Sequence, residues 1–239
     1  MATTDGASVQ LIRNATILLE VGGTTFLVDP IFSDAGANPP NDRRNPLVPM
    51  PDVDLSYDAV VVTHRHPDHW DAVARDALDA DVPLFCQPEE ADAFTDEGFT
   101  DVRPVEHETS FDGVTIHRTP GRHGHGELAE QMGPVSGFVF EADETVYVAG
   151  DTVWYDPLAD TLDRFEPDLV VLNGGEARFE QGQPITMGIE DISAVRDATD
   201  ATVVVVHMEA INHCLLTRDE LRGATEAVNV PEDGEMISL

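Results

Sequence analysis

Short apolar runs separated by polar turns follow one another along the chain, and their spacing predicts a mixed α/β protein. The first three runs predict β-strands at residues 9–13, 15–21 and 24–29. The pair Gly22-Gly23 between the second and third strands is typical of a hairpin turn. The continuous apolar run at residues 57–63 predicts a strand that is buried on both faces. Residues 30–56 are polar and rich in proline, and a loop this long inside a compact domain is usually functional or mobile.

The rest of the chain alternates between strands and helical segments. Further strands are predicted at residues 82–85, 100–105, 113–119, 135–141, 145–149, 168–172 and 202–207. Helices are predicted at residues 71–78, 89–94, 190–198 and 218–227. Thr217 and Glu220 have the spacing of a capping box at the start of the last helix. Because no repeat or interdomain linker interrupts this pattern, we expect one α/β domain over residues 1–239.

Acidic residues dominate the charge of the protein. There are 46 acidic and 13 basic residues, which give a net charge of −33, and lysine is absent. The acidic residues are spread among apolar strands, so we expect a folded domain with an acidic surface rather than a disordered chain. This composition resembles that of cytoplasmic proteins from salt-loving archaea, in which salt screens self-repulsion, so we expect the fold to need molar salt. The same charge argues against nucleic acids and anionic membranes as partners.

The chain carries neither a membrane-spanning nor a secretory pattern. No apolar run approaches the roughly 20 residues that a membrane-spanning helix needs. Residues 1–9 lack the basic and apolar regions of a signal peptide, so we expect a cytoplasmic protein. Two cysteines, Cys86 and Cys214, are too few for a disulfide framework, and Cys86 is predicted to be a buried free thiol.

A cluster of histidines and one aspartate follows the buried strand at residues 57–63. Its members are His64, His66, Asp68 and His69. Imidazole and carboxylate together suit Zn²⁺, Mn²⁺ or Fe. His64 and His66 alternate along an extended chain, so their side chains share one side and can bind one ion. Pro67 turns the chain, so Asp68 and His69 can face a second ion. This segment predicts a metal centre at the end of a strand, where ligands gather in α/β folds.

Four more segments complete a recognisable set of motifs. Asp29 ends an early strand, His123 and His125 lie in the glycine-rich loop of residues 120–133, Asp151 follows Gly150, and His207 follows a late strand. Together with the HxHxDH pattern of residues 64–69, this order resembles the metallo-β-lactamase superfamily over nearly the whole chain. The resemblance implies a four-layer αββα sandwich of two mixed β-sheets flanked by helices.

The resemblance also implies a role for each of these residues. His64, His66 and His123 would hold the first of two divalent metal ions, Asp68, His69 and His207 the second, and Asp151 both. Asp29 would orient ligands without binding metal. Zn²⁺ is the metal that we expect first, with Mn²⁺ or Fe as alternatives. The two ions would share a hydroxide that attacks the substrate at neutral pH, with Asp68, His69 and Asp151 as the catalytic residues.

Two ligand assignments remain open at this point. His123 competes with His125 for the first ion, and His207 competes with His213 for the second; we favour His123 and His207. His125, His213 and Asn173 are then our candidates for substrate contact. The alternatives are an exposed His125, a His213 that caps a helix, and an Asn173 that lies in a plain turn. Arg122 and Arg178 could bind an anion, although ion pairs with acidic residues are the use that so acidic a chain favours.

The expected activity is hydrolysis of a small molecule. A looser resemblance to the ascorbate-6-phosphate-lactonase-like branch implies cleavage of an ester, lactone, thioester or phosphodiester bond. Two alternatives use the same residues: a nuclease or phosphodiesterase of the same fold, and a module that binds a ligand through metal without turnover. A homo-oligomer is compatible with the sequence.

Overall fold

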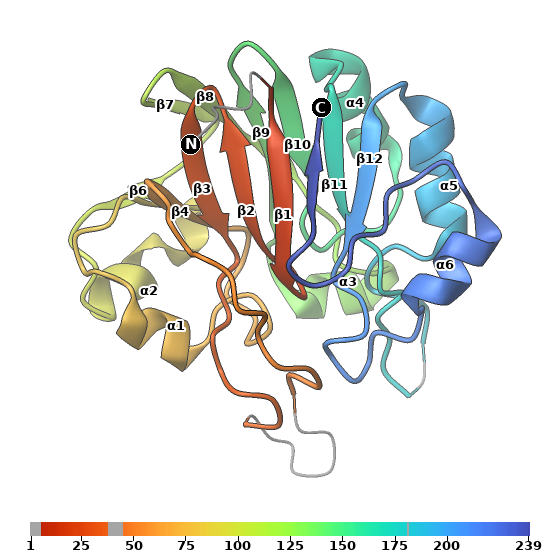
Figure 1. Ribbon diagram of the computed structural model, residues 1–239, viewed down its shortest axis with the longest axis horizontal. Helices are drawn as coiled ribbons and strands as arrows, with labels where there is room; N and C mark the ends of the chain where they lie inside the picture. Colours follow the sequence, from red (N-terminus) through yellow and green to blue (C-terminus); the bar gives the residue numbers. More distant parts are fainter. Residues whose placement is uncertain (1–5, 38–44, 181) are drawn as a thin grey trace.

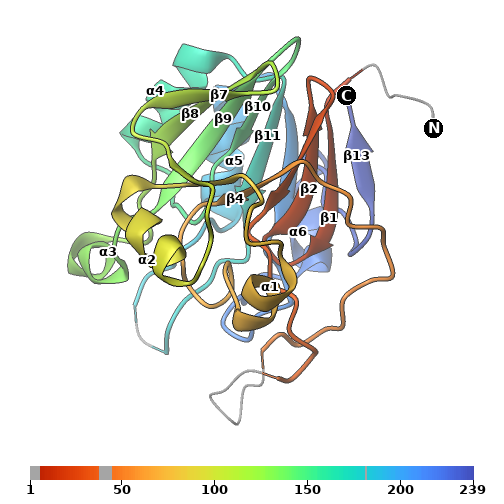
Figure 2. The same ribbon diagram turned by 90° about the vertical axis from the view of Figure 1, so that its left-hand side faces the viewer.

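Two β-sheets lie face to face between two layers of helices (Figure 1). The computed structural model describes residues 6–37, 45–180 and 182–239. Helices α1 and α2 cover the outer face of one sheet, and α4, α5 and α6 cover the outer face of the other. The view turned by 90° shows the same layers (Figure 2). The predicted four-layer αββα sandwich is therefore confirmed.

The first sheet has the order β13-β1-β2-β3-β4-β5-β6 within the described residues. Its strands are β1 (Ser8–Arg13), β2 (Thr16–Val21), β3 (Thr24–Val28), β4 (Ala59–Val62), β5 (Leu84–Cys86), β6 (Val102–Pro104) and β13 (Met236–Ser238). Strands β1, β2 and β3 are antiparallel neighbours, whereas β3 to β6 run parallel. The predicted hairpin between β2 and β3 is confirmed, and both Gly22 and Gly23 have the positive φ that its turn requires.

The second sheet has the order β12-β11-β10-β9-β8-β7 over the described part of the chain. Its strands are β7 (Glu108–Phe111), β8 (Val114–Pro120), β9 (Ser136–Glu141), β10 (Thr145–Val148), β11 (Leu169–Asn173) and β12 (Thr202–Val206). Strands β10, β11 and β12 run parallel, and β7 to β10 form an antiparallel meander. Each sheet is thus mixed.

Successive side chains of a strand point to opposite faces of its sheet. The strands therefore fill the core between the two sheets and also the apolar layer between each sheet and its helices. In β3, Phe26 and Val28 point into the core between the sheets, whereas Leu27 points to the layer below α1 and α2. Phe26 meets Phe140 of the opposite sheet with ring centroids 5.0 Å apart. A strand that is buried on both faces needs apolar side chains at every position, which is why β4 reads as a continuous apolar run.

The α-helices of the described residues each contain at least one buried residue, except α3. They are α1 (Ala72–Ala77), α2 (Ala91–Asp96), α3 (Gly126–Met132), α4 (Asp156–Phe165), α5 (Ile189–Ala198) and α6 (Arg218–Ala224), with a 3₁₀ turn at Pro88–Glu90. Trp70 is buried and packs on Phe94 and Phe99, so it belongs to the core. The capping box of Thr217 and Glu220 is present at α6.

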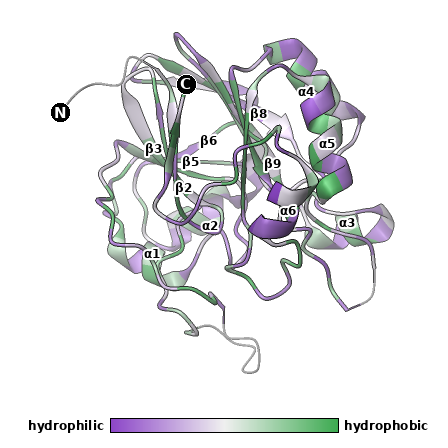
Figure 3. Cartoon of the chain, turned by 45° about the vertical axis from the view of Figure 1, so that its right-hand side comes forward, coloured by the Kyte–Doolittle hydropathy of each residue, from purple (hydrophilic) through white to green (hydrophobic). Residues whose placement is uncertain are grey.

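Hydropathy varies around the helices that cover the second sheet: α4 and α5 carry both hydrophilic (purple) and hydrophobic (green) residues in Figure 3. No helix among the described residues is long and apolar enough to cross a membrane.

Several elements were not predicted from the sequence. Helix α4 was missed, although Leu158, Leu162 and Phe165 have helical spacing and its first turn holds a proline. Helix α3 occupies part of the segment that was predicted as a glycine-rich loop. Strands β7 and β13 are short edge strands without a buried residue, so neither carries an apolar pattern that distinguishes it from loop.

The described parts of the long loop at residues 30–56 are attached to the sandwich. Residues 38–44 lie outside the described residues. The fully buried guanidinium of Arg13, at the end of β1, donates to the carbonyls of Ile31, Ser33 and Val48. The backbone N–H of Leu47 donates to the carbonyl of Ala210. These bonds hold the loop beside the segment that follows β12.

Candidate metal centre

The candidate ligands all lie in segments that leave the sheets in the same direction. Asp29 follows β3, and the segment from His64 to His69 follows β4. His123 follows β8, Asp151 follows β10, and His207 follows β12. Parallel strands bring their carboxyl ends to one edge of a sheet, and the two packed sheets place these edges side by side. The loop after β3 and helix α3 mark this side of the molecule in Figure 1.

His64, His66 and His123 form the first group of side chains. Their nearest ring nitrogens lie within 4.8 Å of one another. The ring centroids of His66 and His123 are 5.2 Å apart, and those of His64 and His66 are 4.4 Å apart. His64 and His123 are buried, and His66 is half-buried. Three imidazoles at this spacing can share one ion.

Asp68, His69 and His207 form the second group. Their ligand atoms also lie within 4.8 Å of one another. The tight turn after Pro67, in which the N–H of His69 donates to the carbonyl of His66, sends His69 into the interior. His207 has a φ of 59°, an unusual value for a residue other than glycine, and lies 3.1 Å from His69 between their Nε2 atoms. Asp68 keeps 18% of its side chain exposed.

Asp151 lies between the two groups. Its Oδ2 is 3.4 Å from Nε2 of His123, and its Oδ1 is 3.3 Å from Nε2 of His69 and 3.7 Å from Nε2 of His207. Gly150 makes this placement possible, because a Cβ there would lie only 2.8 Å from the carbonyl oxygen of Ser136. One carboxylate therefore faces imidazoles of both groups.

Hydrogen-bond partners fix where the protons of His64 and His66 lie when both rings are neutral. Nε2 of His66 is 3.1 Å from the carbonyl oxygen of Met132, which only accepts, so Nδ1 of His66 carries a lone pair. The hydroxyl of Thr63 donates to Asp29, so its oxygen accepts from Nδ1 of His64, and Nε2 of His64 carries a lone pair. These two lone-pair nitrogens are 2.9 Å apart. A cation between them removes the repulsion.

The same reasoning applies to the other rings. Nδ1 of His69 donates to the carboxylate of Asp29 at 2.7 Å, and Nδ1 of His123 donates to the carbonyl of Ile185 at 2.8 Å. The Nε2 atom of each ring therefore turns a lone pair toward the cluster. The inward-facing donor set of imidazole nitrogens and carboxylate oxygens matches the chemistry that Zn²⁺, Mn²⁺ and Fe prefer, so these residues fit a metal.

The electrostatics of the cluster favour positive charge beside Asp151. Burial disfavours charge on His69, yet the carboxylates of Asp151 and Asp29 raise the pKa of His69 to about 10. Burial disfavours charge on Asp151 as well, yet His69 and His207 hold its pKa well below the usual range. In contrast, burial and the neighbouring His69 lower the pKa of His64 well below its ordinary value. The cluster thus attracts cations, protons or metal ions alike.

Asp29 lies beside the cluster and belongs to none of the groups of candidate ligands found among the described residues. It accepts from the N–H and the hydroxyl of Thr63 and from His69, all at 2.7 Å. Its φ of 47° is unusual for an aspartate at a strand end. This carboxylate fixes the ring of one candidate ligand and the backbone before His64.

The residues that the sequence suggested for substrate contact take three different positions. Asn173 is buried, and its amide donates to Oδ1 of Asp151 at 2.7 Å. His213 is half-buried and stacks on Phe179 with centroids 6.1 Å apart. His125 precedes α3, lines a separate hollow with Asp191, and is absent from the groups of candidate ligands among the described residues.

Two buried residues of the centre escaped the sequence analysis. Asn14, at the end of β1, donates its amide to the carbonyl of Asp68 and accepts the N–H of His207 on its own carbonyl. The thiol of Cys214 lies 3.3 Å from Nδ1 of His207. Neither position carries a motif: the contacts of Asn14 join segments that are far apart in sequence, and Cys214 reaches His207, seven residues before it, only through the fold of the loop after β12.

The two candidate anion-binding arginines are engaged elsewhere. Arg178 forms an ion pair with Glu176, with 2.5 Å between the charged atoms. Arg122 donates to the carbonyl of Trp154 and lies over the ring of Tyr155 at 4.6 Å. Arg178 thus forms the ion pair with an acidic residue that the composition favours, whereas the contacts of Arg122 are with a carbonyl and an aromatic ring.

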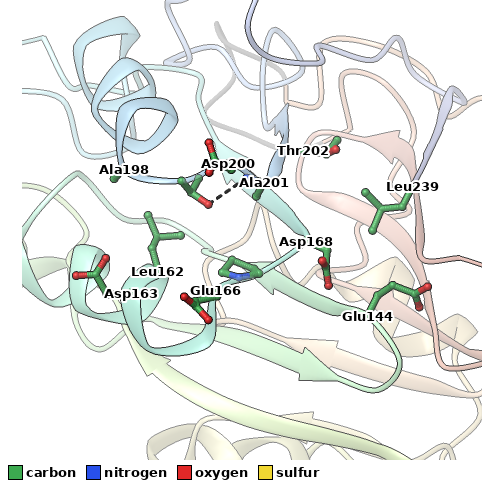
Figure 4. Close-up of a pocket in the computed structure, with 12 residues that line it drawn as sticks. Glu144, Leu162, Asp163, Glu166, Asp168, Ala198, Asp200, Ala201, Thr202 and Leu239 are labelled. Atoms are coloured by element: carbon green, nitrogen blue, oxygen red, sulfur yellow. Dashed lines mark hydrogen bonds between the residues drawn. The ribbon is translucent and has the colours of Figure 1, made fainter.

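A different hollow lies at the opposite ends of the parallel strands (Figure 4). Its volume is about 660 Å³, and its acidic lining residues are Glu144, Asp163, Glu166, Asp168 and Asp200. Asp168 comes directly before β11, whereas Asn173 of the metal side ends it. The groups of candidate metal ligands found among the described residues do not include any member of this hollow.

Comparisons with known proteins agree with this geometry. A family model described as the β-lactamase superfamily domain matches residues 24–208. The UPF0173 protein YddR of Bacillus subtilis (strain 168) is 40% identical over 95% of this chain and 98% of its own length. The crystal structure of an isothiocyanate hydrolase from Delia radicum gut bacteria is 39% identical, with a TM-score of 0.89 over 97% of this chain and 98% of that one. A possible metal-dependent hydrolase from Veillonella parvula DSM 2008 is 35% identical, with a TM-score of 0.92 over 98% and 100%.

The fold and the cluster of inward-facing ligands define a metal-dependent hydrolase. The chain belongs to the metallo-β-lactamase superfamily, as its match to the family model and its similarity to relatives over nearly their whole length show.

Proposed function

We propose that this protein is a hydrolase that uses two divalent metal ions to cleave a small molecule. One ion would be held by His64, His66 and His123, and the other by Asp68, His69 and His207. Asp151 would help to hold both. Zn²⁺ is the metal that this donor set suits first, because zinc is usually bound by three or four nitrogen, sulfur or oxygen ligands in tetrahedral sites. Mn²⁺ and Fe bind the same kinds of ligand and are the alternatives.

The observation that carries this proposal is the convergence of ring nitrogens. Nε2 of His64 and Nδ1 of His66, which carry lone pairs in the neutral rings, lie 2.9 Å apart, and the Nε2 atoms of His69 and His207 lie 3.1 Å apart. Each pair belongs to a different group of candidate ligands, so each supports its own ion. The two oxygens of Asp151 face the two groups separately.

We assign different roles to the residues of the centre: one transfers a proton, and others hold the candidate ligands in position. Bound metal ions supply a water nucleophile that is active at neutral pH and polarise the scissile bond. Asp68 is the most exposed carboxylate at the centre and accepts and passes the proton of the attacking water. His69 stays fixed because Asp29 holds its outer nitrogen, and Asn173 holds Asp151 in the same way.

The substrate class follows from what a water nucleophile can attack. Esters, lactones, thioesters and phosphodiesters each present an electrophilic carbon or phosphorus to it. The looser resemblance to ascorbate-6-phosphate lactonases stays a prediction, since the relatives described above carry other names. His213 is our candidate for substrate contact, because it is half-buried in the segment that follows His207 and stacks on Phe179 without joining the groups of candidate ligands found among the described residues.

A second candidate substrate is an isothiocyanate. The specific support is a relative of that activity that is 39% identical over nearly the whole chain. Water adds through its oxygen to the central carbon of R–N=C=S, and the resulting thiocarbamate breaks its C–N bond to give the amine R–NH₂ and carbonyl sulfide. This reaction consumes one water and needs no oxidant or reductant.

Two alternatives remain for the same site. A nuclease needs a basic surface to hold phosphates, and a net charge of −33 opposes that. A module that binds metal without turnover needs a centre with no open coordination position. A gel assay on RNA and DNA tests the first alternative, and turnover of any small substrate excludes the second.

The test uses purified protein loaded with Zn²⁺, Mn²⁺ or Fe²⁺, and the same protein stripped with a chelator. Substrates are p-nitrophenyl acetate, a γ-lactone, an acyl thioester, bis-p-nitrophenyl phosphate and benzyl isothiocyanate. We expect turnover of at least one substrate by the loaded protein, loss of turnover after stripping, and recovery when metal returns. Two bound ions by elemental analysis without turnover of any substrate would overturn the hydrolase proposal.

A further inference from the structure

The five histidines of the candidate centre differ in what holds their outer nitrogens. Four of them contact oxygen atoms, which belong to Thr63, Met132, Asp29 and Ile185. The outer nitrogen of His207 instead lies 3.3 Å from the sulfur of Cys214. Cysteine sulfur is a weak hydrogen-bond acceptor compared with carboxylate or carbonyl oxygen. His207 is therefore the ring with the weakest outer partner.

The direction of this hydrogen bond follows from the geometry of the ring. Nε2 of His207 faces inward, 3.1 Å from Nε2 of His69 and 3.5 Å from Oδ2 of Asp68. When this nitrogen binds a cation, the proton of the neutral ring must lie on Nδ1. The sulfur of Cys214 then accepts a hydrogen bond from Nδ1–H, and the orientation of the ring depends on where the sulfur lies.

The position of the sulfur is set by a close approach of three chain segments. The N–H of Cys214 donates to the carbonyl of Ile211, and the N–H of Leu216 donates to the carbonyl of Gly175. A Cβ at Gly175 would lie 2.3 Å from the carbonyl oxygen of His207 and 2.9 Å from the sulfur of Cys214. Only glycine lets the segment after β11 close against both residues. The sulfur is thus buried in a fitted position.

We propose that Cys214 is a positioning residue that sets how tightly the ion at Asp68, His69 and His207 is held. This inference rests on the proposed pair of metal sites. Outer partners of ligand histidines fix the ring and raise its basicity, and losing one typically lowers metal affinity about 10- to 100-fold. His64, His66 and His123 have other partners, so the ion that they hold is independent of Cys214.

The experiment measures binding of Zn²⁺ and Co²⁺ to the full-length protein, without substrate. Cys214→Ala removes the acceptor, and Cys214→Ser restores a hydrogen-bonding atom there. We expect Cys214→Ala to raise the dissociation constant of one ion about 10-fold or more while the other stays within twofold, and Cys214→Ser to recover part of the loss. The visible absorption bands of Co²⁺ in the weaker site should also shift.

Cys86 provides the matched control. It is the other buried free thiol, and it packs among apolar residues under α1 and α2. Cys86→Ala removes the same sulfur from the core, so it reports the effect of a buried cavity alone. We expect Cys86→Ala to leave the dissociation constants of both ions within twofold. If Cys214→Ala also leaves both within twofold, or raises both to the same extent, the proposal is overturned. Because no turnover is measured, a failure of the hydrolase assay is distinguishable from a failure of this inference.

Discussion

The two ends of the parallel strands β10, β11 and β12 both collect acidic side chains, yet they have opposite properties. At the carboxyl ends, Asp151 is 3% exposed and lies against three imidazoles. At the other ends, about 16 Å away along a five-residue strand, Asp163, Asp168 and Asp200 are exposed around an open hollow. The same residue type therefore serves two purposes in one sheet.

The difference shows what a cluster of carboxylates needs before it can be read as a metal site. A buried carboxylate is costly unless other groups compensate it, so its presence indicates a cation or hydrogen-bond donors beside it. Exposed carboxylates are hydrated and need no partner. Imidazole is the second distinguishing feature, because the hollow at the other end has acidic groups and no histidine. Burial together with mixed ligand chemistry separates the two ends, and acidity alone does not.

Removing the charge of Asp151 tests this comparison most strongly. Asp151→Asn keeps the shape of the side chain but replaces the oxygens that face both groups of histidines with one oxygen and one amide. We expect hydrolysis to fall by more than about 100-fold, because the loss exceeds that of an outer partner, and bound metal to fall below the parent count. Initial rates and elemental analysis measure both effects.

The matched control for Asp151→Asn comes from the other end of the sheet. Asp163→Asn makes the same chemical change in α4 on the rim of the acidic hollow. Its rate and metal content should stay within twofold of the parent. Equal losses in both variants would mean that net charge, and not the position of the carboxylate, governs the centre.

The next largest effect is expected on the number of bound metal ions when His207, rather than His213, is replaced. His207→Ala removes a ring whose Nε2 faces His69 and Asp68, so we expect bound metal to fall from two ions to about one. His213→Ala removes a half-buried ring that stacks on Phe179, and the metal count should remain. Equilibrium dialysis with elemental analysis distinguishes them. The reverse pattern would exchange the two assignments.

The fold was largely predictable because its strands carry strong signals. Strands buried on one or both faces show period-two or continuous apolar patterns, and the order of motifs from Asp29 to His207 indicated the sandwich. Helix α4 was missed although its spacing was readable. Strand β13 was not readable, since its three residues form a strand only by pairing with β1.

The candidate centre was predictable to the extent that its residues lie in motifs. The six-residue segment after β4 and the aspartate after Gly150 carry local patterns. Asn14 and Cys214 do not: Asn14 contacts His207 only after β1 and β12 have come together, and Cys214 contacts it through a loop that closes against Gly175. Outer partners of ligands depend on tertiary geometry, and a sequence pattern can name the ligand but not what holds it.

Asp29 and Asp151 provide a second comparison, between two buried carboxylates at the carboxyl ends of the strands. This carboxylate is as buried as Asp151, but it accepts from Thr63 and His69 and does not join the groups of candidate ligands. Asp29→Asn should lower metal affinity about 10- to 100-fold, because an amide holds the ring of His69 less firmly. Metal titration followed by turnover at saturating metal tests this, and recovery at high metal is expected. A loss that saturating metal leaves unchanged would contradict the supporting role.

The smallest effect is expected from the acidic hollow itself. Its carboxylates repel one another in low salt, and counterions screen that repulsion when the Debye length falls to about 3 Å at 1 M. The double variant Asp163→Asn/Asp200→Asn should therefore raise the melting temperature in low salt by about 1–2 °C, the shift that a few tenths of a kcal/mol gives in a chain of this size. In molar KCl the gain should vanish.

The parent protein should itself melt at a higher temperature in molar KCl than in low salt, because the acidic side chains that give its net charge of −33 repel one another over the whole surface. Calorimetry of both proteins in the two buffers measures these shifts. A parent melting temperature that does not rise with KCl would show that the acidic surface imposes no requirement for salt, whereas a gain for the variant that persists in molar KCl would place its cause in packing rather than in charge.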